Sequence, residues 1–285
     1  MLLDAPDPAA FLAGPAAAHF LERNTEPDGP DGRWVGWTDL AADDLALLRA
    51  VHAHLVTTEE MPAQAAAKYV VESVAGRAAE LVGFTLAVAR AGLLLDLPAT
   101  YWRLHPGYTD LARTAPGHVL VARGHPWSGC AGVEVVADLR TIVERTTRHL
   151  VTALEPAVLA CRRLARVGSG ALWDEVCDGF AMPLTFAGPS LPVVRAAVDV
   201  LDAATALPGL PWRRRPRLEL ARSRGGPFYL AQKGGCCLSY TAPRQTTEDG
   251  TPEYCSTCRF RSADDVDGRQ VAWHEDARGV RADTL

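Results

Sequence analysis

Lysine is almost absent from this sequence: Lys68 and Lys233 are the only two, and all other basic side chains apart from histidine are arginine. Together with abundant alanine, glycine and proline, this indicates a GC-rich coding bias rather than an adaptation. The formal net charge of -5 also leaves no basic excess of the kind that dedicated nucleic-acid-binding proteins carry. We therefore expect no nucleic-acid partner.

The sequence also lacks a long uninterrupted apolar run. Its most apolar stretch, residues 81–97, is broken by Arg90 and Asp96 and falls short of the roughly 20 apolar residues that a bilayer-spanning helix needs. The first residues include Asp4 and Asp7 and no positively charged segment, which is unlike a secretion signal. We expect a cytoplasmic protein with no integral membrane segment, in which thiols stay reduced.

Neither of the common glycine motifs for nucleotide binding is present. No G-x-G-x-x-G follows a predicted strand, and there is no G-x-x-x-x-G-K-[ST]. We therefore expect no nicotinamide or flavin in a dinucleotide-binding fold. A redox function would then depend on a separate electron donor.

Helical periodicity dominates the first 210 residues. The apolar content of the segment that Pro62 opens predicts a buried central helix. Residues 118–123 and 132–137 are short β-branched runs on either side of a turn that contains glycine and proline, and they predict a hairpin. The expected helices cover residues 39–57, 62–95, 138–167, 170–187 and 191–206.

The character of the sequence changes near residue 210. Prolines, a burst of arginines and paired glycines are followed by short extended runs at 217–221 and 227–231, a group of cysteines and a polar tail. We predict a helix-rich α+β fold in two parts. Residues 1–210 form a helical body with the embedded hairpin, and residues 211–285 form a small cysteine-bearing module.

Four of the seven cysteines lie within 23 residues, in the order C-C, seventeen residues, C-x-x-C. They are Cys236, Cys237, Cys255 and Cys258. Four thiolates from two short segments suit either zinc or an iron–sulfur cluster. Structural zinc sites favour two spaced knuckles, whereas adjacent side chains diverge, so the vicinal pair favours a two-iron cluster. A zinc ribbon and two structural thiols beside an incidental C-x-x-C stay open as alternatives. A thioredoxin-like site is disfavoured because no βαβ pattern precedes it.

The segments CCLSY at 236–240 and CSTC at 255–258 resemble the carboxy-terminal signature of the FhuF-like ferric-siderophore reductase family. The resemblance implies a [2Fe-2S] cluster with Cys236, Cys237, Cys255 and Cys258 as its ligands, behind a helix-rich body. It also implies one-electron reduction of Fe(III)-siderophore complexes that releases Fe(II), with electrons from a ferredoxin- or flavodoxin-like donor. The motif covers a small part of the chain, and the polar insertion PRQTTEDGTPE makes the gap between its halves longer than the family's.

The implied reaction is chemically reasonable for a surface cluster. Hydroxamate or catecholate oxygens hold Fe(III) tightly and Fe(II) much more weakly, so one electron releases the iron and leaves the chelator intact. Outer-sphere transfer requires no proton-transfer group, and we name no catalytic residue beyond the cluster. Two other functions stay open: an iron–sulfur sensor of iron or oxidant status, and a zinc-stabilised interaction protein.

Seven basic side chains lie within 21 residues ahead of the cysteines, opposed only by Glu219. The docking candidates among them are Arg213, Arg214, Arg215 and Arg217. Such a run steers an acidic electron carrier or an anionic ferric chelate toward a site, but an ordinary solvated face has the same composition.

The remaining cysteines and aromatic residues favour structural roles. Cys130, Cys161 and Cys177 are separated and stand in apolar contexts, which is typical of buried thiols. His274 follows the cysteine motif closely enough to be considered as a hydrogen-bond donor near it. The aromatic residues of the carboxy-terminal part are expected to form its small core: Trp212, Tyr229, Tyr240, Tyr254 and Trp273.

Overall fold

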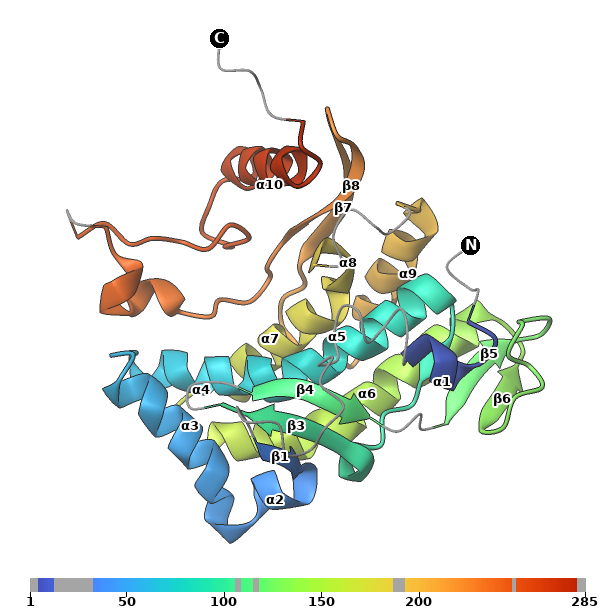
Figure 1. The fold of residues 1–285 in the computed structure, drawn as a ribbon, viewed down its shortest axis with the longest axis horizontal. Coiled ribbons are helices and arrows are strands. Elements are labelled where there is room, and N and C mark those ends of the chain that lie inside the picture. The colour runs from blue at the N-terminus through green and yellow to red at the C-terminus, as the bar shows by residue number, and fades with distance from the viewer. Residues whose placement is uncertain are drawn as a thin grey trace.

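The computed structural model describes residues 5–12, 33–105, 109–114, 118–186, 193–247 and 250–280, and it is rich in helix, as predicted (Figure 1). The helical elements are α1 (Pro8–Phe11), α2 (Trp37–Ala41), η2 (Asp43–Leu45), α3 (Ala46–Thr57), α4 (Ala63–Val71), η3 (Glu72–Gly76), α5 (Arg77–Phe84), η4 (Thr85–Ala89), η5 (Leu97–Ala99), α6 (Leu139–Arg162), α7 (Ser169–Ala181), α8 (Pro183–Phe186), α9 (Arg195–Thr205), η7 (Ser239–Thr241), η8 (Pro243–Gln245) and α10 (Ala263–Ala277). The strands are β1 (Arg33–Gly36), β2 (Gly92–Leu93), β3 (Thr100–Leu104), β4 (Thr109–Thr114), β5 (Val119–Ala122), β6 (Val133–Val136), β7 (Arg217–Ser223) and β8 (Gly226–Gln232).

The centre of the body is one helical stretch made of α4, η3, α5 and η4. Its alanine, valine and leucine side chains are buried on nearly every side, which matches the buried central helix expected after Pro62. The stretch ends at Arg90, whose backbone is left-handed (φ 53°). It ends a few residues earlier than the predicted limit at about residue 95.

Helix α7 crosses this central stretch in direct backbone contact. A Cβ atom at Gly83 would lie 1.9 Å from the carbonyl oxygen of Phe180, and one at Gly179 would lie 2.6 Å from that of Gly76. Only glycine permits an approach this close. The charged residues of α4 and η3 therefore lie against those of α7.

Helix α6 is the longest helix of the body. Its N-cap, Asp138, accepts a hydrogen bond from the backbone N–H of Thr141 at 2.8 Å, which satisfies one of the free amides of the first turn. Pro156 lies inside the helix, which nevertheless continues to Arg162. The predicted helix over 138–167 is confirmed, with its end a few residues earlier.

The predicted hairpin over residues 118–123 and 132–137 is wrong in strand direction. Strands β5 and β6 form there, but they pair in parallel, with Val119 opposite Val133. Runs of β-branched residues specify strands but not the direction in which two strands pair. Instead, β3 and β4 pair antiparallel in the body, and β1 adds to the other edge of β3.

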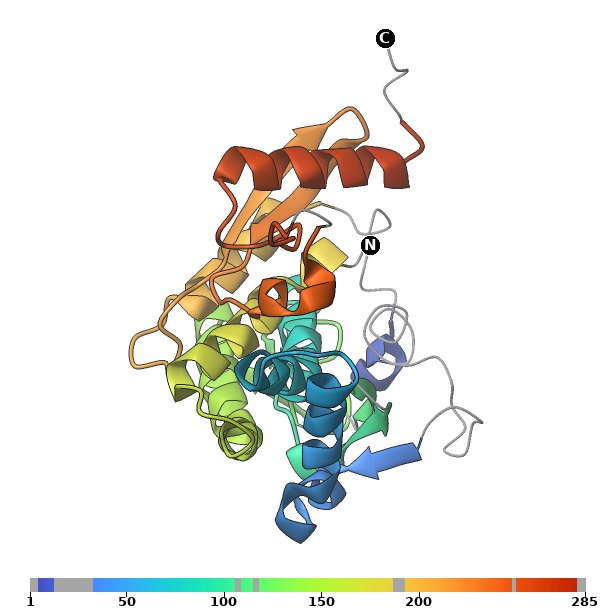
Figure 2. The same ribbon diagram turned by 90° about the vertical axis from the view of Figure 1, so that its left-hand side faces the viewer.

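The carboxy-terminal part consists of the antiparallel hairpin β7–β8, the cysteine loops and α10 (Figure 2). The hairpin confirms the extended runs predicted at 217–221 and 227–231. Within the polar segment that follows the cysteines, residues 263–277 form α10, which the sequence pattern did not predict; it is capped by Ser262, whose side chain accepts from the backbone N–H of Asp265. Its contacts with the hairpin are largely polar: Gln270 bonds both backbone groups of Ala231. Apolar periodicity cannot reveal a helix held in this way.

The hydrophobic core runs from the body into the hairpin through Leu218, Tyr229 and Ala231. The boundary near residue 210 stays a prediction. None of the helices in the described part of the chain is long and apolar enough to cross a membrane.

Candidate metal centre

The four cysteines of the motif lie on two loops of the carboxy-terminal part. Cys236 and Cys237 follow β8, and Cys255 and Cys258 precede α10. Cys237 and Cys258 are buried, Cys236 and Cys255 are half-buried, and all four thiols are free.

The structure brings these four thiols together. The Cys255 thiol raises the pKa of Cys237, as burial also does, and the Cys237 thiol lowers the pKa of Cys255, so these two side chains interact. Burial raises the pKa of Cys258, which also interacts with Cys236, Cys237 and Cys255. The two halves of the motif, separated by seventeen residues, therefore lie close enough for their thiols to interact.

Each of the four sulfurs has a hydrogen-bonding group two residues further along the chain. The backbone N–H of Leu238 bonds the sulfur of Cys236, and that of Phe260 donates to Cys258 Sγ at 3.5 Å. The hydroxyls of Ser239 and Thr257 lie 3.2 Å from Cys237 Sγ and 3.9 Å from Cys255 Sγ, respectively. Hydrogen bonds to the ligand sulfurs are among the features that set the potential of an iron–sulfur cluster.

The donor set is sulfur only. Among the residues that the structure describes, no group of three or more His, Cys, Asp or Glu side chains surrounds a single metal-ion position. Four convergent thiols, each with its own hydrogen-bonding group, fit the all-cysteine ligation of a [2Fe-2S] cluster. The assignment of these four residues as ligands stays a prediction.

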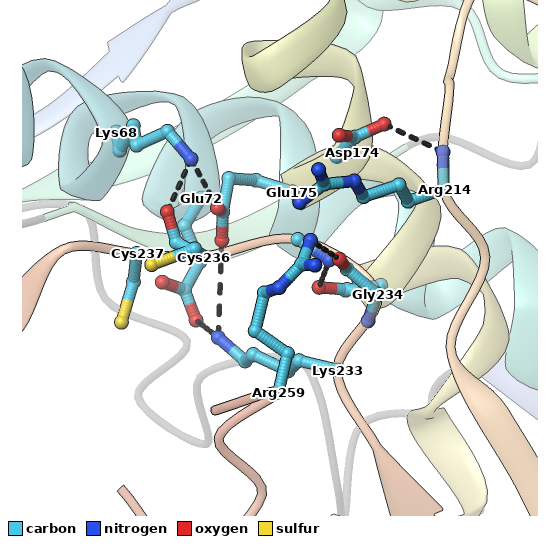
Figure 3. A network of polar contacts seen from close by, with 12 residues as sticks. Lys68, Glu72, Asp174, Glu175, Arg214, Lys233, Gly234, Cys236, Cys237 and Arg259 are labelled. Carbon is cyan, nitrogen blue, oxygen red and sulfur yellow. Dashed lines mark hydrogen bonds and ion pairs between the residues drawn. The ribbon is translucent and has the colours of Figure 1, made fainter. Parts of the chain in front are cut away.

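A buried charged network lies beneath the first cysteine pair (Figure 3). Lys68 of α4 and Glu175 of α7 form an ion pair at 2.9 Å, and Lys233 pairs with Glu72 of η3 at 3.2 Å. Lys233 also lies 3.9 Å from Glu175, which links the two pairs. Lys68 donates a further hydrogen bond to the carbonyl oxygen of Cys236. Both lysines of the chain therefore belong to this one network.

The network changes the pKa values of its acidic members in opposite directions. Burial opposes ionisation of Glu72, but the charge and hydrogen bond of Lys233 lower its pKa below the ordinary value. Burial raises the pKa of Glu175, and burial and the nearby Glu175 charge raise that of Asp178 well above its usual range. Burial opposes the charge of Lys233, yet Glu72 and Glu175 raise its pKa.

Two glycines permit the close approach of the cysteine loop to the body. The Asp178 carboxylate accepts hydrogen bonds from the backbone N–H groups of Gly234 at 2.8 Å and Gly235 at 2.9 Å. A Cβ atom at Gly235 would lie 2.9 Å from that carboxylate, and one at Gly234 would lie 2.5 Å from the backbone of Arg215. The pair Gly234-Gly235 is thus required by packing immediately before the cysteines.

Three aromatic rings cluster beside the thiols. Tyr240 lies 5.0 Å from Tyr254 and 5.8 Å from Phe260 between ring centroids. Burial raises the pKa of Tyr240, and the thiols of Cys236 and Cys258 raise it further, which places this ring near the cysteines. Tyr240 and Tyr254, predicted to be small-module core, therefore pack around the candidate centre.

The arginine run does not form one patch. Arg214, Arg215 and Arg217 line a cavity of ≈ 1120 Å³, whereas Arg213 is not among its lining residues. Asp174 accepts hydrogen bonds from the backbone N–H groups of Arg213 at 2.8 Å and of Arg214 at 3.1 Å, and so holds the start of the run against α7. Of the four predicted docking residues, three therefore share a site.

The other residues singled out in the sequence have structural surroundings. Cys161 and Cys177 are buried, as predicted, and burial raises the pKa of Cys161 to about 12. Cys130 is only half-buried. His274 is stacked on Phe228 and lies 2.8 Å from the Ser223 hydroxyl, so it supports the hairpin.

The sequence reasoning missed the charged network. Two features of the sequence could have indicated this network: lysine is rare, and charged residues interrupt otherwise apolar helical segments. These residues are Lys68 and Glu72 in the segment after Pro62, and Asp174, Glu175 and Asp178 in the segment after Ser169. Charged residues are almost never fully buried unless they are paired. Comparison with protein-family models, with curated proteins and with solved structures finds no match to this chain.

Proposed function

We propose that Cys236, Cys237, Cys255 and Cys258 hold a [2Fe-2S] cluster and that the protein reduces Fe(III)-siderophore complexes by one electron in the cytoplasm, which releases Fe(II). The observation that carries the proposal is the convergence of four thiols that each have a hydrogen-bonding group two residues further on. The resemblance of the motif to ferric-siderophore reductases supports the choice of substrate.

A bound [2Fe-2S] cluster supplies single electrons at a potential that hydrogen bonds, charge and solvent exposure set. The chain's own contribution is a fixed donor set. Lys68 holds the carbonyl of Cys236, and Asp178 holds the two amides before it, so the first cysteine pair is held by bonds to both α4 and α7. Residues locked in this way keep ligands in place through a redox cycle.

Positive charge near the thiols favours their ionised form. Cys255 and burial raise the pKa of Cys237, and the charge of Lys233 offsets part of that rise; at Cys255 the same charge adds to the lowering of the pKa that Cys237 causes. Thiolates are the form that binds metal, so the buried lysine assists assembly of the centre. The same charge favours the reduced, more negative state of a cluster held there.

The aromatic rings of Tyr240, Tyr254 and Phe260 pack against one another beside the thiols. Phe260 itself is 53% exposed, so the centre is close to the protein surface. A centre at the surface is suited to exchange electrons with a separate donor and with a soluble chelate.

The test is anaerobic single-turnover mixing. Protein reconstituted with iron and sulfide is reduced with dithionite and mixed with a panel of ferric siderophores, while its visible absorption is followed. We expect reoxidation by at least one ferric siderophore, with Fe(II) captured by a ferrous chelator. A cluster that oxidants bleach but no ferric chelate reoxidises would indicate a sensor. A colourless protein that binds zinc and gains no cluster would indicate an interaction protein.

A further inference from the structure

A groove of ≈ 1120 Å³ opens beside the cysteine loops, between α9, the segment before β7 and the end of β8. Its lining contains only two carboxylates, those of Asp202 and Glu219. Six of its lining side chains are cationic: Arg195, Arg214, Arg215, Arg217, Lys233 and Arg259.

Half of these cations are available to a ligand. Arg217 pairs with Asp267, Lys233 pairs with Glu72, and Arg259 donates to the carbonyl of Gly234 at 2.8 Å. By contrast, Arg195, Arg214 and Arg215 are exposed, and in the described part of the chain the group that the charges of Arg195 and Arg215 act on within the groove is the Asp202 carboxylate. Exposed guanidinium groups are planar donors that match the oxygen atoms of anions.

The groove adjoins the candidate metal centre along the backbone. Gly234 lines it and precedes Cys236 by two residues, a span of at most about 7 Å of chain. Arg259 also lines it and directly follows Cys258, at about 3.8 Å between Cα atoms. A molecule in the groove therefore lies beside the segments that lead into and out of the cysteine loops.

We propose that this groove is the substrate site and that it selects ferric chelates of net negative charge, such as tris-catecholate complexes, over neutral tris-hydroxamate complexes. This inference rests on the proposed function. In the reaction, the bound Fe(III) gains one electron that comes ultimately from the separate donor, becomes Fe(II), and no bond within the chelator is made or broken.

The charge of the groove favours the product as well as binding. A chelate that gains one electron becomes more negative by one unit. Cations fixed around it therefore stabilise the reduced complex more than the oxidised one, which is the differential binding that lowers a barrier. The same cations attract the anionic substrate from solution.

A small chelate fits this site better than a protein partner does. Small-molecule sites are concave and typically about 300–1,000 Å³, close to the size of this groove. The available guanidiniums line this open groove together with the cations that adjoin the cysteine loops.

The test measures binding without electron transfer. Ga(III) has nearly the radius and the same charge as Fe(III) but is not reduced, so calorimetric titration of the full chain with a Ga(III) tris-catecholate reports the site alone. We expect binding that weakens as salt rises, and binding of a neutral Ga(III) tris-hydroxamate that is at least about tenfold weaker.

Two charge-reversal variants in the groove are compared with one outside it. R195E and R215E, both at exposed positions in the groove, should each weaken tris-catecholate binding by roughly tenfold. R222E, an equal charge change on the exposed part of β7 outside the groove, should alter it by less than about twofold. Equal affinity for the neutral and anionic chelates, or equal effects of all three variants, would overturn the inference.

Two further outcomes separate this inference from the proposed function. Selective Ga(III) chelate binding together with no reoxidation by the Fe(III) chelate would leave the site in place and refute the reductase. Loss of ferredoxin binding in R195E and R215E with unchanged chelate binding would make the groove a docking surface for a protein, and the inference would be wrong.

Discussion

Lys68 donates a hydrogen bond to the carbonyl oxygen of Cys236, which lies 168 residues further along the chain. The same ammonium group pairs with Glu175 on α7 at 2.9 Å. One buried side chain therefore bonds the loop that carries the first cysteine pair to two helices of the body. The position of the candidate ligands depends on the interior of the body as much as on their own loops.

Replacement of Lys68 by Met should destabilise the protein strongly, because Glu175 would stay buried with only the more distant Lys233 to offset its charge. We expect the free energy of unfolding, measured by urea denaturation, to fall by about 3 kcal/mol. The control is R49A, which removes an exposed ion pair with Asp44 and should cost less than about 1 kcal/mol. Similar losses in both variants would show that the network does not anchor the loop.

Replacement of Gly234 by Ala should disturb the cysteine loop, because the added Cβ would lie 2.5 Å from the backbone of Arg215. We expect a loss of about 1–3 kcal/mol in the free energy of unfolding and a lower iron content after reconstitution. G129A is the matched control, since nothing lies within 4 Å of its added atom. An iron content in G234A equal to that of G129A would contradict the required close approach.

Single replacement of Cys236, Cys237, Cys255 or Cys258 by Ser should abolish or badly destabilise the cluster. The parent protein should be reddish-brown, with about two irons and two acid-labile sulfides per chain. The same substitution at Cys130, Cys161 or Cys177 should leave the visible spectrum unchanged, because none of these thiols belongs to the convergent group. If C177S lost its colour as completely as C255S, the ligand assignment would be wrong.

The attachment of α10 should weaken in mild acid through His274. Burial against the hairpin, and then the charge of Arg278, lower the pKa of His274 below its ordinary value of 6.5. As the pH falls, His274 therefore takes up a proton in the unfolded chain before it does so in the folded protein. The free energy of unfolding is at its full value above about pH 6.5, where His274 is neutral in both states. Below that pH it falls by up to about 1.4 kcal/mol per pH unit. Urea midpoints between pH 7.5 and 5.5 measure this slope.

H274Q removes the titrating ring at that position and should flatten the slope over the same range. H118Q is the control, because His118 is an exposed residue paired with Glu134 on the far part of the body. A pH slope in H274Q as steep as in the parent would show that other groups cause the acid sensitivity.

The helices of the body follow from local sequence, whereas other features depend on contacts between distant segments. The apolar period after Pro62 and the Asp138 cap each specify a helix within a few residues. The direction in which β5 and β6 pair depends on the path of the chain between them, which no local pattern encodes. Helix α10 is bound by Gln270 and His274 through polar contacts, so apolar periodicity does not detect it.

The candidate site likewise has features that the sequence predicts and features that only the folded structure reveals. The spacing C-C…C-x-x-C predicted four thiols as ligands, and in the structure these thiols interact with one another. The arginine run indicated a cationic site, but Arg195 and Arg259, which complete the groove, stand outside the run. The charged network joins positions on α4, η3 and α7 with Lys233, the residue that follows β8, and it becomes visible only when these elements are packed together.

Because both lysines of the chain are buried, the rate at which their amines are chemically modified measures how often this part of the protein opens. The side chains of Lys68 and Lys233 are only 5% and 13% exposed, and both are held in ion pairs. Acetylating or methylating reagents should therefore modify both ε-amino groups of the folded protein slowly, and modify them much faster when the cysteine loop separates from α4 and α7. Mass spectrometry of such labelling would follow that opening residue by residue.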